Sequence, residues 1–432
     1  MYFIVENTEQ LSEMSHCDSC FVQAVSSNDN YHPKLSSLSL IYYNDFKKGY
    51  VFVIDHSEGF SLQLQQVQNF LNLHKKVYVL DKKFHSYFLD TSKYIDLQFI
   101  SMNQVGKFES FNCDTVVHRD FYQKYPDDPK LNQIIPISKH YEKCECLLNK
   151  IWHLMELETS VEMEDRLVNA YKKVEENGIA INLSHFDKTY KTNVKQYSIK
   201  NALIYGSYNL YNITGRPTNA FNGINFLAIQ KDKEHRQCFV PKNDLLVEFD
   251  FDAYHLRLIA KLTDYKFQRE ESIHVELGKM YFNTPVLTEK EYKKAKEITF
   301  KQLYGGIEEQ YKEIPFFASL NSYIETEWKK YNTFGAVVLP TGRTIKKTQG
   351  LNKLQLFNYI VQNMETKENV EKIEKLLEYL KDKKTDLILI TYDSFLFDFS
   401  AEDGKQTLID IKNILQQGDM IVKHKYGKDY SF

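Results

Sequence analysis

The first part of the chain alternates short apolar runs with an amphipathic stretch. FIV, CFVQAV, LSLIYY and GYVFVID have the pattern of strands, and SLQLQQVQNFLNLHKKVYVLD has that of a helix leading into another strand. Alternating strands and helices are typical of an α/β fold. We therefore expect an α/β domain over residues 1–155.

A long helical pattern follows this region. From Ile137 through Asn177 apolar residues recur at intervals of three and four, and Gly178 fits the position just after a helix end. We expect a helical connection with a short further segment over 156–213, and a last domain over 214–432.

One later segment carries carboxylates at every second position. In LLVEFDFDAY (245–254), Glu248, Asp250 and Asp252 alternate with apolar residues, so a strand would present all three on one face. Stacked carboxylates repel one another unless cations neutralise them. The pattern predicts either a metal site or a solvent-exposed polar strand face.

Another aspartate stands where a second strand pattern breaks. LILITYDSFLFDF (387–399) loses its alternation at Tyr392-Asp393-Ser394, which predicts a hairpin with Asp393 at its tip. An aspartate at a tip commonly just forms the turn. A catalytic role for Asp393 therefore depends on its neighbours.

Between the two aspartates lies a helix pattern, KEYKKAKEITFKQLYGG (290–306), with Lys296, Phe300 and Tyr304 at i, i+4 and i+8 on one face. A cation and aromatic rings on one face can hold a triphosphate and a base. Together with Asp250 and Asp393, this helix predicts a nucleotidyl-transfer enzyme.

Several segments resemble, in the correct order, motifs of the family A DNA polymerases, the group of bacterial DNA polymerase I. DFDAYHLR (250–257) resembles the first palm motif, KEITFKQLYG (296–305) the fingers-helix motif, and YDS (392–394) stands where the family has His-Asp-Glu. Weaker matches are GIAIN (178–182), TGRPTNAFNGINFLAI (214–229), RQCFVP (236–241), TGR (341–343), NYIVQ (358–362) and the C-terminal KYGKDYSF. The resemblance spans about residues 160–432.

This resemblance implies an α/β plus α+β fold: a degenerate RNase H-like 3′–5′ exonuclease domain followed by a right-hand polymerase domain with palm, fingers and a truncated thumb. It implies template-directed addition of deoxynucleotides to a primer 3′ end by a two-metal mechanism. Asp250 and Asp393, with the backbone carbonyl of Phe251, would bind two Mg²⁺ ions, for which Mn²⁺ can substitute.

The resemblance also implies roles for side chains around the metals. Lys296 would be catalytic by neutralising the triphosphate, and Phe300 and Tyr304 would stack on the incoming base pair. Lys293 and His255 would also bind the nucleotide. The positions that match contacts to primer–template DNA are Arg216, Asn225, Arg257, Arg343, Asn358 and Gln362.

The chain departs from the family at several motif positions. His255 replaces a glutamate that screens out the ribose 2′-hydroxyl, so relaxed sugar selectivity is one alternative. Ser394 replaces an acidic residue, for which Glu248 or Asp252 could compensate. Tyr292 and Lys301 replace an arginine and a glycine. A primer–template-binding replisome scaffold with weak or absent catalysis is the other alternative.

Two domains look reduced. The segment between GIAIN and TGRPT is much shorter than the family's thumb, so we expect weak grip on the duplex, low processivity and a processivity factor or other replisome partner. In the exonuclease-like domain, Gln23, Val25 and His85 stand where carboxylates are needed, and only Asp114 and Glu145 remain. A two-metal nuclease cannot hold its ions without carboxylates, so we expect no proofreading.

Composition adds little to this picture. The net charge of −3 gives no general attraction to nucleic acid, so DNA would be bound by local lysine clusters. No apolar stretch has the length of a membrane span, and six scattered cysteines suggest a reducing compartment. We expect a cytoplasmic protein without membrane partners, in a host cell if a phage encodes it.

Overall fold

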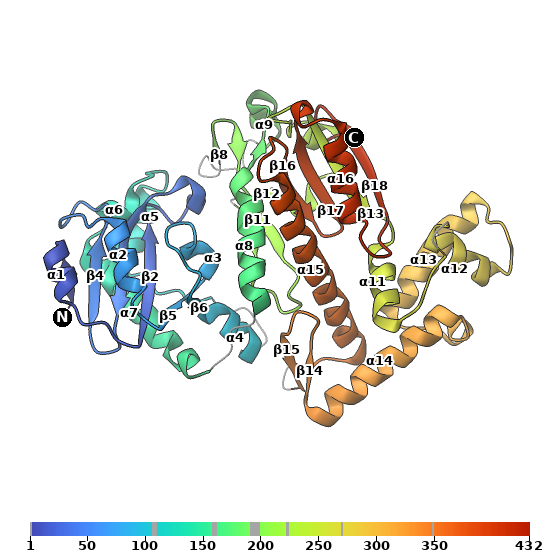
Figure 1. Cartoon of the computed structure of the whole chain (residues 1–432), viewed down its shortest axis with the longest axis horizontal. Coiled ribbons are helices and arrows are strands. Elements are labelled where there is room, and N and C mark those ends of the chain that lie inside the picture. The colour runs from blue at the N-terminus through green and yellow to red at the C-terminus, as the bar shows by residue number, and fades with distance from the viewer. Residues whose placement is uncertain are drawn as a thin grey trace. The chain divides into compact units, whose positions relative to one another are not determined.

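The structure is a computed structural model that describes residues 2–105, 110–157, 162–190, 199–221, 224–268, 271–347 and 350–432. The chain forms two compact units (Figure 1), the first made of Met1–Tyr211 with Asn219–Gln230 and the second of Asn212–Thr218 with Lys231–Phe432. The expected connection over 156–213 falls almost entirely within the first unit, and its residues 158–161 and 191–198 lie outside the described residues. The three-part division therefore stays a prediction.

The first unit contains a six-stranded mixed sheet in the order β1-β4-β3-β2-β5-β6. β1, β4, β2, β5 and β6 include three parallel pairings, whereas β3 pairs antiparallel with both β2 and β4. The strands are β1 (Phe3–Val5), β2 (Ser19–Ser26), β3 (Leu38–Asn44), β4 (Gly49–Val53), β5 (Lys76–Val79) and β6 (Tyr94–Asp96). All four expected strand runs and the helix–strand pair are confirmed.

Both faces of this sheet are buried, because successive side chains of a strand point to opposite sides. On β2, Val22 and Ala24 pack into one core with Phe70 of α2 (Leu64–Leu71). Phe21 and Val25 pack into the other core, with Ile151 of α7 (Ile137–Ile151). A central strand covered on both faces explains its nearly continuous apolar sequence.

The long helical pattern is interrupted in the structure. α7 gives way to a 3-10 helix over Trp152–Glu156, and α8 begins separately and spans Glu162–Asn177. Gly178 follows α8 with a φ of 63°, the conformation expected just past a helix end. The prediction of a single helical stretch was therefore wrong in its middle and right at both ends.

The other elements of the first unit are short. Its remaining helices are α1 (Thr8–Glu13), α3 (Lys82–His85), α4 (Leu97–Val105), α5 (Val116–Lys124), α6 (Leu131–Ile134) and α9 (Leu183–Thr189). Two small sheets contain β7 (Ile179–Ala180), β8 (Ile199–Lys200) and β9 (Leu203–Ile204), and β10 (Tyr208–Asn209), β11 (Thr218–Phe221) and β12 (Ile224–Asn225).

The second unit is built on a four-stranded antiparallel sheet in the order β16-β17-β13-β18. Its strands are β13 (Leu245–Phe251), β16 (Asp386–Thr391), β17 (Ser394–Phe399) and β18 (Val422–Gly427). β13 lies between β17 and β18, so the sheet joins segments that are far apart in sequence. A separate hairpin is formed by β14 (Ala336–Val338) and β15 (Thr344–Lys346).

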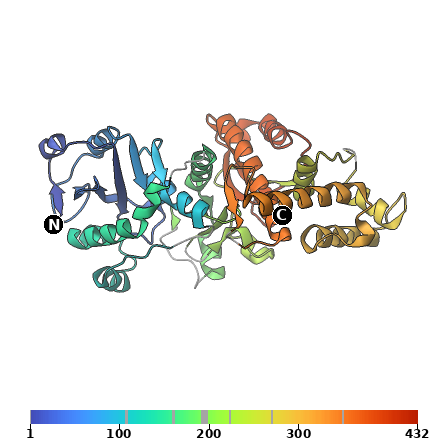
Figure 2. The same ribbon diagram turned by 90° about the horizontal axis from the view of Figure 1, so that it is seen from below.

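Helices α15 and α16 lie beside this sheet, and the pair α12–α13 and helix α14 extend away from it in Figure 1; the yellow-to-orange helices at one end of Figure 2 are the same elements. The helices are α10 (Lys233–Arg236), α11 (Tyr254–Thr263), α12 (Ile273–Phe282), α13 (Glu289–Gly305), α14 (Pro315–Phe334), α15 (Lys353–Leu380) and α16 (Lys405–Leu415). α13 begins at a capping box in which Thr288 and Glu291 bind each other's backbone amides. The helix predicted between the aspartates is confirmed.

None of the helices in the described parts of the chain combines the length and the apolar character that a membrane-spanning segment requires.

Candidate active site

The site begins where β13 turns sharply into α11. β13 buries Val247, Phe249 and Phe251 and turns Asp250 toward solvent, as the alternation predicts. Ala253 then takes a φ of 52°, which lets α11 start at Tyr254 immediately after the strand. Because few non-glycine residues adopt a positive φ, this tight turn is held by its surroundings.

The hairpin β16–β17 brings Asp393 beside Asp250. Thr391 pairs with Ser394 across a turn that contains Tyr392 and Asp393, so Asp393 lies at the tip as predicted. Ser394 pairs with Asp250 in the sheet, and the Asp393 carbonyl accepts a 2.9 Å hydrogen bond from the Phe251 amide. The two aspartates, 143 positions apart in the sequence, are thereby fixed on adjacent strands.

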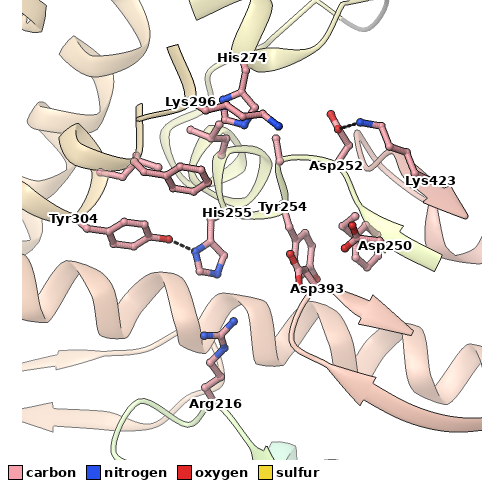
Figure 3. A pocket seen from close by; sticks show the side chains of 15 residues that line it. Arg216, Asp250, Asp252, Tyr254, His255, His274, Lys296, Tyr304, Asp393 and Lys423 are labelled. Carbon is pink, nitrogen blue, oxygen red and sulfur yellow. Dashed lines mark hydrogen bonds and ion pairs between the residues drawn. The ribbon is translucent and has the colours of Figure 1, made fainter. Parts of the chain in front are cut away.

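A pocket of about 480 Å³ opens in front of these carboxylates. Figure 3 shows Asp250 and Asp393 on one side of it, and Tyr304 and His255 on the other. Other residues that line it are Arg216, Phe251, Asp252, Ala253, Tyr254, Leu256, His274, Lys296, Phe300, Leu303 and Lys423. The pocket therefore combines both aspartates with the predicted face of α13.

Both aspartates are harder to ionise than usual. Partial removal from water, followed by the charges of Asp393 and Glu248, raises the pKa of Asp250 to about 6, although Lys425 and Lys423 oppose the shift. Burial, followed by the charge of Glu365, raises the pKa of Asp393. Negative charge is thus concentrated where a cation would be attracted.

The acids that could compensate for Ser394 already have partners. Glu248 accepts 2.8 Å hydrogen bonds from the hydroxyls of Ser394 and Tyr430. Asp252 forms an ion pair with Lys423. The serine therefore anchors Glu248 on the neighbouring strand, so that a third carboxylate remains near Asp250.

α13 presents its predicted face to the pocket. Phe300 and Tyr304 are 48% and 41% exposed, and their rings are almost parallel, 7° apart, with centroids separated by 6.4 Å. Lys296 lies one turn earlier, with its ammonium 4.9 Å from the ring of Tyr292. The face therefore offers open aromatic surface beside a cation.

His274 of α12 is a pocket residue that the sequence did not indicate. It packs against Phe300 and Tyr292, with ring centroids 5.9 and 6.4 Å away. Burial, followed by the charge of Lys296, lowers the pKa of His274 to about 4. A single histidine in an amphipathic helix carries no signal of such a position.

A series of hydrogen-bonded side chains links α13 to α11 and α15 beside the pocket. His255 Nδ1 lies 2.5 Å from the hydroxyl of Tyr304, and His255 Nε2 lies 2.6 Å from Glu365 Oε2 on α15. Arg216 donates from Nε to Glu365 Oε1 at 2.9 Å and stacks on Tyr392, its guanidinium carbon 3.5 Å from the ring centroid. Glu365 carries no signal in the sequence, because it falls in a helix of mixed charges.

Several predicted binding residues lie away from this pocket lining. Lys293 is exposed and pairs with Glu289. Arg257 is buried and donates to the carbonyls of Asp252 and Asp419. Arg343 is buried and donates to the carbonyl of Asn212 at 2.7 Å. In the folded chain both arginines therefore form hydrogen bonds to the backbone, and their contacts to DNA stay predictions.

Three further positions were expected to contact DNA. Asn358 and Gln362 are half-buried on α15. Asn225 is exposed in the first unit, where its side chain accepts a hydrogen bond from the Leu227 amide. The DNA contacts of all three stay predictions.

The acidic residues left in the exonuclease-like region are engaged with other side chains. Glu145 of α7 accepts hydrogen bonds from Tyr42 and from Asn44. Asp114 pairs with Lys143 at 2.8 Å. His85 is fully buried, and its Nε2 accepts a 3.0 Å hydrogen bond from the amide of Ala24.

Within the described residues, no three or more His, Cys, Asp or Glu side chains are grouped so that they could hold a metal ion. The predicted ligands, Asp250, Asp393 and the carbonyl of Phe251, include only two such side chains. The predicted metal binding stays a prediction.

No protein-family model matches the sequence, and no curated protein sequence matches it. Among solved structures, the chain is similar to one described as the POL domain of Pol1 from M. smegmatis in complex with DNA primer-template and dNTP. The TM-score is 0.70 at 13% sequence identity, over 100% of this chain and 99% of that chain. At this identity the likeness establishes the fold, so the resemblance to family A DNA polymerases is confirmed at the level of the fold.

Proposed function

We propose that the chain is a template-directed DNA polymerase that adds deoxynucleotides to a primer 3′ end. The observation that carries the proposal is one pocket, in a polymerase-like fold, that joins Asp250 and Asp393 to the lysine and the aromatic rings of α13. The similar structure was solved with primer-template and dNTP, which supports the same two ligand classes here.

The residues present suit divalent metal ions. Asp250, Asp393 and the carbonyl of Phe251 are hard oxygen donors of the kind that Mg²⁺ prefers. Partial removal from water and, after it, the charges of nearby acids raise the pKa of both carboxyl groups. A cation between them would therefore relieve the repulsion that opposes their ionisation. These groups would hold two Mg²⁺ ions, or Mn²⁺, which when bound neutralise phosphate charge and acidify the primer hydroxyl.

The chain's own side chains would bind and orient the nucleotide. Lys296 supplies a positive charge at the pocket for the triphosphate, and Phe300 and Tyr304 supply the surface on which a base pair stacks. Arg216 and His255 line the same pocket and restrict where the sugar can lie. This order of groups positions a triphosphate near the two carboxylates.

We also propose that the first unit has no proofreading activity and that the thumb is reduced. The engaged acids Glu145 and Asp114 support the first point, because neither is free to bind a catalytic ion. Fewer contacts to the duplex would give low processivity without a partner protein.

Primer extension with Mg²⁺ tests the function. Asp250→Asn and Asp393→Asn should each reduce incorporation at least a thousandfold, roughly 4 kcal/mol in transition-state stabilisation, because each removes a charged metal ligand. Asp386→Asn is the matched control, since Asp386 starts the same hairpin but pairs with Lys242 outside the pocket.

Each result has a definite meaning. Incorporation that survives both pocket changes would remove the proposed active site. Tight primer–template binding with no incorporation by the unaltered protein would support the scaffold instead.

A further inference from the structure

A buried carboxylate on α15, that of Glu365, is hydrogen-bonded to two side chains that line the pocket. The Glu365 side chain is only 1% exposed, and its two oxygens accept hydrogen bonds from two residues that line the pocket. Oε1 accepts from Arg216 Nε at 2.9 Å, and Oε2 lies 2.6 Å from His255 Nε2. Burying a carboxylate costs free energy unless it is hydrogen-bonded to fixed partners. This pairing therefore holds the side chains of Arg216 and His255 in defined orientations.

The arrangement determines which nitrogen of His255 carries a hydrogen. An ionised carboxylate can only accept, so Nε2 must donate to Glu365. In the neutral ring, Nδ1 is then the acceptor, and it receives the hydroxyl hydrogen of Tyr304 across 2.5 Å. With a neutral ring, the hydrogen bonds therefore run in one direction, from Tyr304 through His255 to Glu365.

Glu365 itself is held in place from the other side. The guanidinium of Arg216 is stacked on the ring of Tyr392, the neighbour of Asp393 in the hairpin turn. Helix α13, helix α11, helix α15 and the β16–β17 turn thus meet through one line of side chains. Figure 3 shows its Tyr304–His255 hydrogen bond and Arg216. Glu365 is the one buried acid in that line.

We propose that Glu365 is a positioning residue that fixes the tautomer and orientation of His255 and, through it, holds Tyr304 and α13 at the nucleotide pocket. The proposal rests on the proposed function for its effect on nucleotides, whereas its effect on His255 can be measured without any substrate. Glu365 is hydrogen-bonded to Arg216 and His255, and it affects Asp393 only through its charge.

Glu365→Gln is the informative substitution, because it keeps the size of the side chain and its contact to Arg216. The amide carbonyl can still accept from Arg216, which turns the NH₂ group toward His255 Nε2. The ring must then accept at Nε2 and donate from Nδ1, which reverses the hydrogen bond to Tyr304. Glu368→Gln is the matched control, since Glu368 is buried one turn later on α15 and pairs with Lys261.

Nitrogen NMR of histidine-labelled full-length protein reads this tautomer directly, with the His255 signal assigned by its loss in His255→Gln. We expect hydrogen on Nε2 in the unaltered protein and in Glu368→Gln, and hydrogen on Nδ1 in Glu365→Gln. Tyr304→Phe, a change at a partly exposed site, should leave hydrogen on Nε2 if Glu365 is what fixes it. Unchanged signals in Glu365→Gln, or a tautomer lost in Tyr304→Phe, would overturn the proposal.

Kinetics test the consequence for nucleotide binding. Glu365→Gln should raise the nucleotide KM about tenfold, the change expected for one charge-assisted hydrogen bond, with kcat and primer–template affinity much less affected. Tyr304→Phe should act similarly, and the double variant should be little worse than either single variant. Fold-changes that multiply would show that Glu365 does not act through Tyr304 and would contradict the proposal.

The two proposals fail in different ways. If the unaltered protein incorporates no nucleotide, the proposed function fails, and the tautomer result still decides whether Glu365 fixes His255. If the unaltered protein incorporates nucleotides normally and the tautomer of His255 is unchanged in Glu365→Gln, only the positioning role fails.

Discussion

At the scale of single residues, the two carboxylates of the site stand beside unusual backbone. Ala253 and Tyr392 both have positive φ angles, 52° and 60°, a conformation that costs an L-residue about 1–2 kcal/mol. At Tyr392 the cost is offset by Asn369, which donates to its carbonyl at 2.8 Å, and by stacking with Arg216. Such local strain holds Asp393 out of the regular strand and next to Asp250.

The raised pKa of Asp250 predicts a trade-off between stability and metal binding. Its folded-state pKa of about 6 exceeds the ordinary 3.8, so the ionised carboxylate destabilises the folded state above pH 6. This cost vanishes as the pH falls from 6 toward 4, where the group is protonated when folded.

Asp250→Asn should therefore raise the melting temperature of the metal-free protein at pH 8 by about 2 °C, after allowance for screening of an exposed group. Thermal unfolding at pH 8 and at pH 4 measures this, and the difference should disappear at pH 4. The substitution should also abolish stabilisation by Mg²⁺. Destabilisation at pH 8 would contradict the assigned repulsion.

At the scale of elements, the edge strand β18 adds a row of cations to the sheet. Lys423 pairs in register with Asp250, and Lys425 pairs with Glu248, so both lysines lie on the face that carries the acids. The Lys423 side chain is paired with Asp252, whereas the side chain of Lys425 makes no hydrogen bond or ion pair within the described part of the chain. An exposed cation beside the site suits a phosphate of the primer strand.

Lys425→Ala should weaken primer–template binding and make it less dependent on salt. Loss of one phosphate contact should reduce the slope of log K against log salt by about 1, and should act equally on all DNA sequences. Fluorescence anisotropy over a series of salt concentrations provides the measurement. Lys405→Ala, at the start of α16, is the control; equal slopes in both variants would refute the role of β18.

At the scale of the whole molecule, the chain divides into two units, each with its own sheet and core. Every residue that lines the pocket belongs to the second unit. The first unit retains the layered α/β sheet but ties up Glu145 and Asp114 in contacts to Tyr42 and Lys143. The pocket that contains Asp250 and Asp393 therefore lies within one unit, although its Arg216 comes from a short segment between two stretches of the other.

The whole protein should therefore extend a mismatched primer end or stall at it, and should not excise it. Denaturing gel analysis of a labelled mismatched primer with Mg²⁺ checks for excision without nucleotides and for extension or stalling with them. Excision by the unaltered protein that Glu145→Ala abolishes would prove the first unit to be an active nuclease. Asp120→Ala, outside the expected nuclease positions, controls for nonspecific effects.

The local features of the site could be predicted from the amino-acid sequence. The alternation around Asp250, the break around Asp393 and the helical spacing of Lys296, Phe300 and Tyr304 all follow from periods of two and 3.6 residues, which depend on neighbours in the chain. These features are therefore readable without knowing the fold, and the structure has each of them.

The hydrogen-bond and ion-pair partners of the side chains, in contrast, depend on the three-dimensional fold. In the folded chain His255 is hydrogen-bonded to Glu365, and Ser394 donates a hydrogen bond to Glu248. Arg257 and Arg343 are buried and donate to backbone carbonyls. Such pairings depend on which elements meet in space, and a charged residue in a helix reads the same in sequence whether it is solvated or buried. The positions of the two carboxylates could be predicted because apolar and polar residues alternate along their strands. The hydrogen bonds among His255, Glu365 and Arg216 could not, because only long-range packing brings these residues together.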